Sequence, residues 1–547
     1  QVRVPISELK SWLEKKLATT VFLISYAVLS GNGVSTQRAV GMCLIYLFAD
    51  VTGYAYDMLN ALGIVVLVLL WKNPFLLSYS GFVFSVMAVI AIGVGANVLL
   101  EWEHSWKRRQ QAGEETIKKT FFSRQKEGIL VSFAIQLFTI PLVAYSYYEI
   151  PVYAMLINLF VLAVVNGLLG LTVLGMIVGM AFLPAGRVLF APCGWMLDSY
   201  RFLCEVSLKI PGAQRITGKP AHMRIFWYYL GLGVFLLAIY ACARRNEKHK
   251  DCRETADLCV SRRKKRLQGI VFSCFIAFLL LFLLFPQKKS FEIDFLDVGQ
   301  GDGIYLCTGG GTSMFIDGGS TDVKQVGKYR ILPFLKAKGV SEISYWFVSH
   351  TDTDHVSGLK EVLVSGYRVE YLVFAKAVEK EAKTKELAEL ARSHGTKVLY
   401  MQAGDTVRSK RAAMRCLYPK ASDKAEDVND LCLVLQFEEG DIRALFGGDI
   451  STDVEEQLLR RRKWDKVLIF KADHHGSRYA NAEALLKCIR PEITVASAGK
   501  DNRYGHPSPD AVQRIKESGS RFFCTIEGGR IRVRVIENKL VCETYVK

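Results

Sequence analysis

Residues 343–355 are Ile-Ser-Tyr-Trp-Phe-Val-Ser-His-Thr-Asp-Thr-Asp-His, an apolar run that changes abruptly into histidines and aspartates. A short apolar run rich in aromatic and β-branched residues is typical of a buried strand. Alternate residues on the extended turn after it point the same way, so His350 and Asp352 can share one metal ion. Asp354 and His355 then turn toward a second ion. This segment therefore predicts a strand that ends in a metal site.

Later strands carry further candidate ligands. The predicted strands at 441–446 and 466–470 lead into Asp449 and the pair His474-His475, and the strand at 493–497 precedes His506 by nine residues. Ligands at the ends of several strands are how a layered α/β sandwich collects a metal site along one edge. Asp449 can bridge, because a carboxylate has two oxygens and two adjacent cations need a shared anion. Imidazole and carboxylate together suit zinc or manganese, so two such divalent ions are expected.

A single histidine at a strand end is more often structural than a ligand. Here six of the nine histidines lie between 350 and 506, and all but His394 are in ligand-like contexts. We expect His394 to be a surface turn residue and the others to serve the site. Adjacent side chains do not easily face the same ions, so one of His474 and His475 is expected to be structural. The other is a ligand or a general acid.

Residues up to about 285 form long apolar runs, and a helix needs about 20 apolar residues to cross the hydrocarbon core. Residues 151–182 contain no charge and are too long for one comfortable crossing, so we expect a break near Gly167 and Gly170 and two tightly turned spans. Leu183–Lys219 is only semi-polar and predicts an interfacial amphipathic helix. About nine spans are expected in all, near 17–31, 38–56, 60–77, 81–100, 128–147, 151–182 (two), 224–243 and 267–285.

Two basic loops indicate the orientation. Residues 101–127 carry seven Lys and Arg, and residues 244–266 carry ten, so both loops should face the cytoplasm. Both loops lie on the cytoplasmic side only if residues 151–182 cross the membrane twice. The last span then leaves the cytoplasm, which predicts that the part after Pro286 lies outside.

The overall composition fits two dissimilar halves. The net charge of +17 is explained mainly by these loops, and attraction to polyanions is the second reading. The 13 cysteines include no CxxC pair and indicate no disulfide framework.

The sequence begins with Gln rather than Met, so a missing upstream segment is expected. Four intramembrane polar residues are best explained by helix-end solvation and interhelical hydrogen bonds: Asp50, Asp57, Asn158 and Asn166.

Several motifs together resemble the ComEC family, the DNA-internalisation proteins of natural competence. In the second half they are Asp297-Val-Gly-Gln-Gly-Asp302, Ser349–His355, Gly447-Gly-Asp449, Lys471-Ala-Asp-His-His-Gly-Ser477 and Tyr504-Gly-His-Pro507. In the first half they are Arg38-Ala-Val-Gly-Met42, Asn73-Pro74 and Ser80-Gly-Phe-Val-Phe-Ser85. The resemblance covers almost the whole chain.

The resemblance implies a polytopic all-α membrane domain at 1–286, partial at its N-terminus, followed by an αββα metallo-β-lactamase-type sandwich at 287–547. It identifies as metal ligands His350, Asp352, Asp354, His355, Asp449 and His506. It identifies as catalytic Asp354, His474 and His475. Supporting roles fall to Asp297, Asp302, Asp317, Asn429, Asp430, Lys471 and Ser477.

The sequence departs from the family or from the commoner metal-binding motif in three ways. The oligonucleotide-binding-type domain and an early membrane segment that usually precede this part are not in the sequence. Asp352 stands where the commoner HxHxDH motif has a second histidine, which is normal for this family. The usual third ligand of the first site is missing, and Asn429 or Asp430 occupies its expected place. The loop Asp297–Asp302 is expected to order the site rather than to catalyse.

The expected function is a DNA uptake channel that passes single-stranded DNA across the cytoplasmic membrane, with a nuclease domain on the extracytoplasmic side that degrades the other strand. The expected partners are DNA, membrane lipid, a DNA receptor and a cytoplasmic motor. Two alternatives stay open. One is a membrane-anchored metallo-hydrolase of another extracellular substrate, although nine spans exceed what an anchor needs. The other is a transport protein whose hydrolase fold has lost catalysis and only binds strands.

Overall fold

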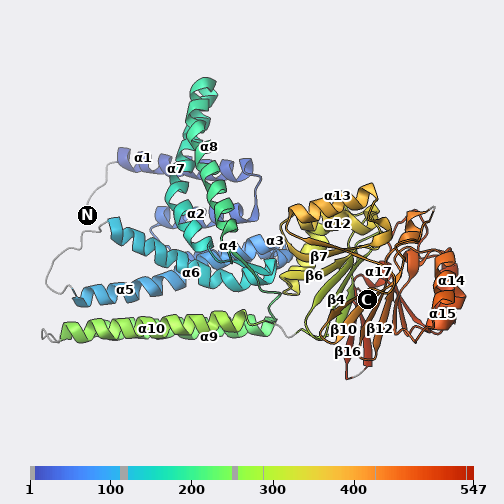
Figure 1. The fold of residues 1–547 in the computed structure, drawn as a ribbon. Coiled ribbons are helices and arrows are strands. Elements are labelled where there is room, and N and C mark those ends of the chain that lie inside the picture. The colour runs from blue at the N-terminus through green and yellow to red at the C-terminus, as the bar shows by residue number, and fades with distance from the viewer. Residues whose placement is uncertain are drawn as a thin grey trace. The chain divides into compact units, whose positions relative to one another are not determined.

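The computed structural model divides the chain into two compact units, Gln1–Phe285 and Pro286–Lys547. The structure describes residues 6–110, 121–248, 257–286, 289–425, 427–537 and 539–546. Figure 1 shows helices throughout the first unit and strands only in the second, apart from one short strand pair. Each unit is described by itself.

The first unit is helical. Its elements are α1 (Ile6–Leu29), α2 (Val34–Thr52), α3 (Met58–Lys72), η1 (Pro74–Ser78), α4 (Ser80–Ile90), η2 (Ala91–Ala96), α5 (Asn97–Gln110), α6 (Phe121–Tyr147), β1 (Glu149–Pro151), α7 (Ala154–Ala181), α8 (Leu183–Lys209), β2 (Gln214–Ile216), α9 (His222–Lys248) and α10 (Asp257–Leu283). Within the described residues, four helical segments are long and apolar enough to cross a membrane: Ser80–Ser105, Lys126–Tyr147, His222–Arg245 and Arg263–Leu283. Shorter apolar helices lie at Met58–Lys72 and Gly167–Ala181. The nine predicted spans stay a prediction: four is the number among the described residues only, and α7 is itself an apolar helix of 28 residues.

The long apolar helices pack closely at small residues. Ala91 and Ala96 of the π-helical turn η2 are buried in one cluster with Leu137 of α6 and Tyr228 of α9. A Cβ on Gly95 would lie 2.8 Å from the ring of Phe138, so only glycine permits this approach. The Tyr228 hydroxyl donates to the carbonyl of Leu137 at 2.9 Å. A buried hydroxyl is thereby satisfied inside an apolar bundle.

The predicted break at Gly167 and Gly170 is wrong. Residues 154–181 form one continuous helix, α7, and the chain turns only at Phe182 before α8 begins with Pro184 in its first turn. Glycines are tolerated within an apolar helix, whereas proline favours the first turn of a new one. Residues 183–209 are helical as predicted, and the interfacial position of α8 stays a prediction.

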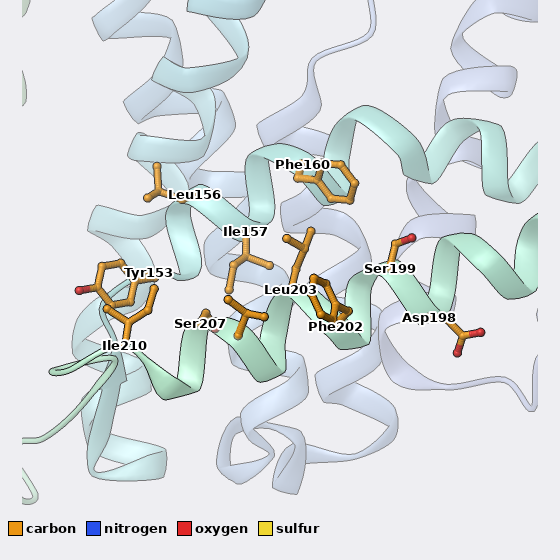
Figure 2. A pocket seen from close by; sticks show the side chains of 11 residues that line it. Tyr153, Leu156, Ile157, Phe160, Asp198, Ser199, Phe202, Leu203, Ser207 and Ile210 are labelled. Carbon is orange, nitrogen blue, oxygen red and sulfur yellow. The ribbon is translucent and has the colours of Figure 1, made fainter.

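Helices α7 and α8 form an antiparallel hairpin. At its tip a Cβ on Gly186 would lie 2.5 Å from the Cα of Gly179. At its base β1 pairs antiparallel with β2, with Glu149 opposite Ile216. A mostly apolar groove runs between the first half of α7 and the second half of α8, lined by Ile157, Leu203 and their neighbours (Figure 2). The hairpin therefore returns the chain to the end of the bundle where it left α6.

The two predicted basic loops flank one end of the helical bundle. Parts of both loops lie outside the described residues, but their flanking helices are placed. Lys265, near the start of α10, donates to Glu103 of α5 at 3.1 Å. At the other end Arg224 of α9 donates to the carbonyl of Phe285 at 2.5 Å. The segment that leaves α10 thus lies at the end opposite the basic loops.

The second unit contains two mixed sheets. The 8-stranded sheet has the order β17-β16-β3-β4-β5-β6-β7-β8, and the 7-stranded sheet has the order β15-β14-β13-β12-β11-β10-β9. The strands of the first are β3 (Glu292–Phe295), β4 (Gly303–Cys307), β5 (Ser313–Asp317), β6 (Glu342–Phe347), β7 (Arg368–Ala375), β8 (Lys397–Met401), β16 (Ile531–Ile536) and β17 (Lys539–Thr544). Those of the second are β9 (Thr406–Ser409), β10 (Ala412–Tyr418), β11 (Val434–Glu439), β12 (Ile442–Phe446), β13 (Ile469–Lys471), β14 (Ile493–Ala496) and β15 (Arg521–Cys524).

The two sheets pack face to face with helices on both outer faces. One buried cluster joins Phe347 of the first sheet to Phe446 of the second. The outer face of the first sheet, with Trp346, is covered by α11 (Leu332–Ala337), α12 (Thr353–Val364) and α13 (Ala382–Ser393). The second sheet is covered by α14 (Thr452–Arg461), α15 (Glu483–Ile489) and α16 (Pro509–Glu517). Burial on both faces explains why β6 is mostly apolar, and the result is the predicted αββα sandwich.

Parallel strands place the candidate ligands on one edge. Strands β12, β13 and β14 are parallel, with Phe446 opposite Lys471 and Lys471 opposite Val495. The residues that follow β12 and β13 therefore emerge side by side, which brings Asp449 next to the His474-His475 pair. In the first sheet β5 and β6 are also parallel, and His350 follows β6. Side chains with binding roles commonly collect beyond the carboxyl ends of parallel strands.

Candidate metal centre

Two overlapping groups of side chains could each hold a metal ion. The first is Asp302, His355, Asp449 and His475, all buried; the second is His350, Asp354 and His355. Within each group the candidate ligand atoms lie within 4.8 Å of one another. His355 belongs to both groups, so the two positions adjoin.

His355 is fixed by a buried carboxylate behind it. Its Nδ1 lies 3.0 Å from Oδ2 of Asp317, which also accepts from the Ser349 hydroxyl at 2.8 Å. Its Nε2 therefore faces the centre, 3.4 Å from Oδ2 of Asp449 and 3.9 Å from Oδ2 of Asp354. A carboxylate behind a histidine fixes the ring orientation and raises its basicity as a ligand.

Two glycine loops press against the start of α12 and bring Asp302 into the centre. A Cβ on Gly301 would lie 2.4 Å from the carbonyl oxygen of Asp354, and one on Gly319 would lie 2.5 Å from the nitrogen of His355. The amide of Asp302 donates to the carbonyl of Asp354 at 3.1 Å. The Asp297–Asp302 loop was predicted only to order the site. The structure goes further and places Asp302 itself in the ligand cluster.

His474 and His475, of which one was expected to be structural, both lie near Asp449. Their Nε2 atoms lie 3.9 Å and 3.3 Å from Oδ2 of Asp449. Both residues adopt positive φ, 49° and 54°, so the side chains do not alternate as they would along a strand. The Nδ1 of His475 is held 3.0 Å from the carbonyl of Ser497. Only His475 belongs to a metal-ligand group.

Unpaired buried atoms converge on this site. Among the described residues, Oδ1 of Asp302, Oδ1 of Asp449, Nε2 of His355 and Nε2 of His475 are buried without a hydrogen-bond partner. Buried polar atoms in folded proteins are nearly always partnered. Carboxylate oxygens and imidazole nitrogens are the donors that zinc and manganese accept. The residues present therefore fit divalent metal ions.

Two predicted ligands lie outside the two ligand groups. Oδ1 of Asp352 accepts from Lys383 at 2.8 Å, and this side chain is 44% exposed. Its other oxygen is 3.9 Å from Nε2 of His350. The ring centroid of His506 lies 5.5 Å from that of His474 and 6.2 Å from that of His475.

Among the described residues, the expected place of the missing third ligand contributes no member of either ligand group. Asp430 accepts from the amide of Ser451 at 3.1 Å, and neither it nor the half-buried Asn429 belongs to a ligand group. Instead Cys432, three residues after Asn429, is buried with its Sγ 3.4 Å from Nδ1 of His350. Cys432 thus contacts the ring of His350 without being a member of either ligand group.

Of the remaining predicted residues, Lys471 contacts the ligand cluster directly. Lys471 is almost fully buried and lies 2.7 Å from Oδ2 of Asp302. Oδ1 of Asp297 accepts from Arg330 at 3.0 Å, and the amide of the buried Ser477 donates to the carbonyl of His474 at 2.8 Å. His394 is exposed at the C-terminal end of α13, as predicted for a surface turn residue.

The electrostatics of the centre follow from crowded buried charges. Burial alone would lower the pKa of His475, but Asp449 and Asp302 outweigh it and raise that pKa to about 9. Burial and the neighbouring His355 lower the pKa of His350 to about 4. Burial opposes ionisation of Asp354, but hydrogen bonding from His475 lowers its pKa to about 2. Asp354 is therefore charged and His475 holds a proton, whereas His350 is neutral.

Comparison with known proteins agrees with this architecture. Residues 5–241 match the family model described as "Competence protein". The "ComE operon protein 3" of Bacillus subtilis (strain 168) is 24% identical over 94% of this chain and 63% of its own length. "Recombination protein 2" of Haemophilus influenzae is 23% identical over 95% of this chain and 63% of its own length. The chain thus spans less than two thirds of each of these relatives.

Solved structures resemble only part of the chain. The metallo-β-lactamase fold protein YhfI from Bacillus subtilis is 11% identical, with a TM-score of 0.31 over 43% of this chain and 96% of its own. Zn(2+)-bound PqqB from Methylobacterium extorquens is 11% identical, with a TM-score of 0.29 over 41% of this chain and 85% of its own.

Fold and site together define a protein with a helical part containing several long apolar helices and a metallo-β-lactamase-type domain after it. More particularly, the chain is a relative of competence proteins of the ComEC type across most of its length, which confirms the resemblance seen in the motifs.

Proposed function

We propose that this chain is a DNA uptake channel of natural transformation and that its second half is a metal-dependent phosphodiesterase acting on the strand that is not taken up. The observation that carries the enzymatic part is the convergence of unpaired ligand atoms of Asp302, His355, Asp449 and His475. The relationship to competence proteins supports DNA as the substrate.

The metal ions and three histidines of the centre have different roles in the proposed reaction. Divalent cations, zinc or manganese, supply Lewis-acid stabilisation of the charge that develops on a phosphodiester. His355 and His475 would hold them through Nε2, because Asp317 and the carbonyl of Ser497 fix their Nδ1 atoms. The side chain of His474 is 33% exposed and its Nε2 is 3.9 Å from Asp449, so it is placed to hold the proton for the leaving oxygen.

The predicted location is part of the same proposal. Positively charged loops remain on the cytoplasmic side of a membrane. Both basic loops flank one end of the bundle, and the chain leaves α10 at the other end. This supports a cytoplasmic-membrane protein with its hydrolase half on the extracytoplasmic side. Lipid surrounds the helices, and a DNA receptor and a cytoplasmic motor are the proposed protein partners.

The test uses the full chain purified in detergent. Bound metal is measured, and labelled single- and double-stranded DNA is offered with manganese or with zinc. We expect cleavage by the wild type and about 100-fold less by Asp449→Ala, because a candidate metal ligand is lost. Asp441→Ala is the matched control, since Asp441 is exposed at the opposite end of β12. A wild type that binds metal but cuts neither substrate would refute the nuclease, and the inactive-hydrolase alternative would replace it.

A further inference from the structure

An aromatic stack leads out of the metal centre. The ring of His506 lies 6.2 Å from that of His475, with an interplanar angle of 28°. The ring of Tyr504 lies 5.8 Å from that of His506, with an interplanar angle of 25°. Three stacked rings, each inclined by 28° or less to the next, thus connect a candidate metal ligand to the protein surface.

The outer ring of this stack is exposed but held in place. Tyr504 is 52% exposed. Its loop is fixed by Asn502, whose Nδ2 donates to the carbonyls of His506 at 2.6 Å and Gly499 at 2.8 Å. The Oδ1 of Asn502 accepts from the amide of His506 at 2.9 Å. An exposed ring on a braced loop costs little entropy when it binds a ligand.

The guanidinium group of Arg503 contacts the ring of Tyr504. The Cζ of Arg503 lies 5.1 Å from the centroid of Tyr504, and its Nη2 donates to the Tyr504 hydroxyl at 3.0 Å. In the part of the chain that the structure describes, no ion pair joins Arg503 to a carboxylate. An aromatic face beside an unneutralised guanidinium matches a base and its phosphate.

We propose that Tyr504 and Arg503 bind an unpaired nucleotide next to the phosphodiester at the metal centre, with the base stacked on Tyr504 and the phosphate on Arg503. This inference rests on the proposed function and narrows its substrate to a single strand or a frayed end. Bases inside a duplex are stacked on one another and offer no free face. Stacking on an aromatic ring tolerates any base, so cleavage at this site is independent of sequence.

The experiment compares a single-stranded oligodeoxynucleotide with an abasic strand of equal length, which keeps the phosphates and lacks the bases. Binding to the full chain in detergent is measured by fluorescence anisotropy, with a chelator present to prevent cleavage. We expect the wild type to prefer the base-bearing strand about ten-fold, the size of one stacking contact. Tyr504→Leu should remove most of this preference, whereas Tyr504→Phe should keep it. Arg503→Ala should weaken binding of both strands alike.

The outcomes separate this inference from the proposed function. If Tyr504→Leu discriminates as well as the wild type, the stacking site is wrong, whether or not the chain cuts DNA. If the wild type binds neither strand, the proposed function and the stacking site both fail. Bound metal and thermal stability are measured for every variant with metal present. A loss of metal in Tyr504→Leu together with unchanged discrimination would show that the ring only supports His506, and would also overturn the proposal.

Discussion

Lys471 places a buried positive charge among the carboxylates of the metal centre. Its ammonium group lies 2.7 Å from Oδ2 of Asp302 and donates to the carbonyl of Ala472 at 3.0 Å. Burial lowers the pKa of this lysine, but Asp302 and Asp449 outweigh that effect and raise it. The lysine therefore stays charged and offsets part of the repulsion among the buried acids.

Removing this charge should destabilise the hydrolase half. Lys471→Met leaves Asp302 buried without its partner, and breaking such a pair costs about 3 kcal/mol. For a unit of this size that lowers Tm by about 8 °C, measured by thermal unfolding of the metal-free chain in detergent. Lys487→Met is the control, because Lys487 is paired with Glu483 on the exposed face of α15 and should leave Tm unchanged. Equal melting of the two variants would contradict the role given to Lys471.

Metal affinity should rise with pH. The pKa of His475 is raised to about 9 in the ion-free centre, chiefly by Asp449 against the effect of burial. Below pH 9 a metal ion must displace that proton, so affinity increases by about ten-fold per pH unit for each proton displaced. Titration calorimetry between pH 6.5 and 9, in two buffers of different ionisation enthalpy, measures the protons released. Affinity that is flat across this range would show that His475 is not a ligand.

At the level of elements, the α7–α8 hairpin depends on two small residues at its tip. A Cβ on Gly186 would lie 2.5 Å from the Cα of Gly179 and 3.0 Å from the carbonyl oxygen of Gly175. Backbone atoms cannot move aside as a flexible side chain can. The closest approach of the two helices is therefore possible only with glycine.

Gly186→Val should push the helices apart at a cost of about 2 kcal/mol. Gly194→Val on the same helix is the matched control, because a Cβ there meets nothing within 4 Å. Thermal unfolding of the two variants in detergent, with size-exclusion chromatography to detect aggregation, measures the difference. If Gly194→Val is equally destabilised, the loss of stability comes from the lower helix propensity of valine and not from the close contact between α7 and α8.

The sequence predicted some elements correctly and others wrongly. The strand β6 was found because it is mostly apolar, and it is mostly apolar because Phe347 faces the other sheet while Trp346 faces the helices. The break in α7 was predicted wrongly because glycine weakens a helix in water but is tolerated in an apolar bundle. Helix propensity therefore gave a wrong prediction where the apolar surroundings reduce the free-energy cost of glycine in a helix.

For the whole molecule, the proposed orientation predicts which surfaces an impermeant reagent reaches. In a chain whose native cysteines are replaced by alanine, Lys539→Cys of the hydrolase half should react with an impermeant maleimide in intact cells. Arg263→Cys, beside the second basic loop, should react only after permeabilisation. Both positions are exposed. The opposite pattern would place the hydrolase half in the cytoplasm and refute its proposed access to external DNA.

The sequence alone determined the order of the two halves and the segments that carry ligands. Apolar periodicity encodes which side of a local element is buried, so strands and their polar ends could be found without coordinates. His350, Asp354, His355, Asp449 and His475 were all singled out in this way, and the structure brings them to one edge. Each of them follows a strand or opens the helix after it.

Only the tertiary structure decided which of these side chains form one cluster. Asp302 enters it because Gly301 and Gly319 let two loops touch the start of α12, whereas Asp352 pairs with Lys383 instead. Asp449 meets His475 because β12 and β13 are parallel in one particular register. Metal ligands must converge within a few ångströms, and segments far apart in the chain do so only through sheet register and loop contacts. Sequence periodicity carries no information about those contacts.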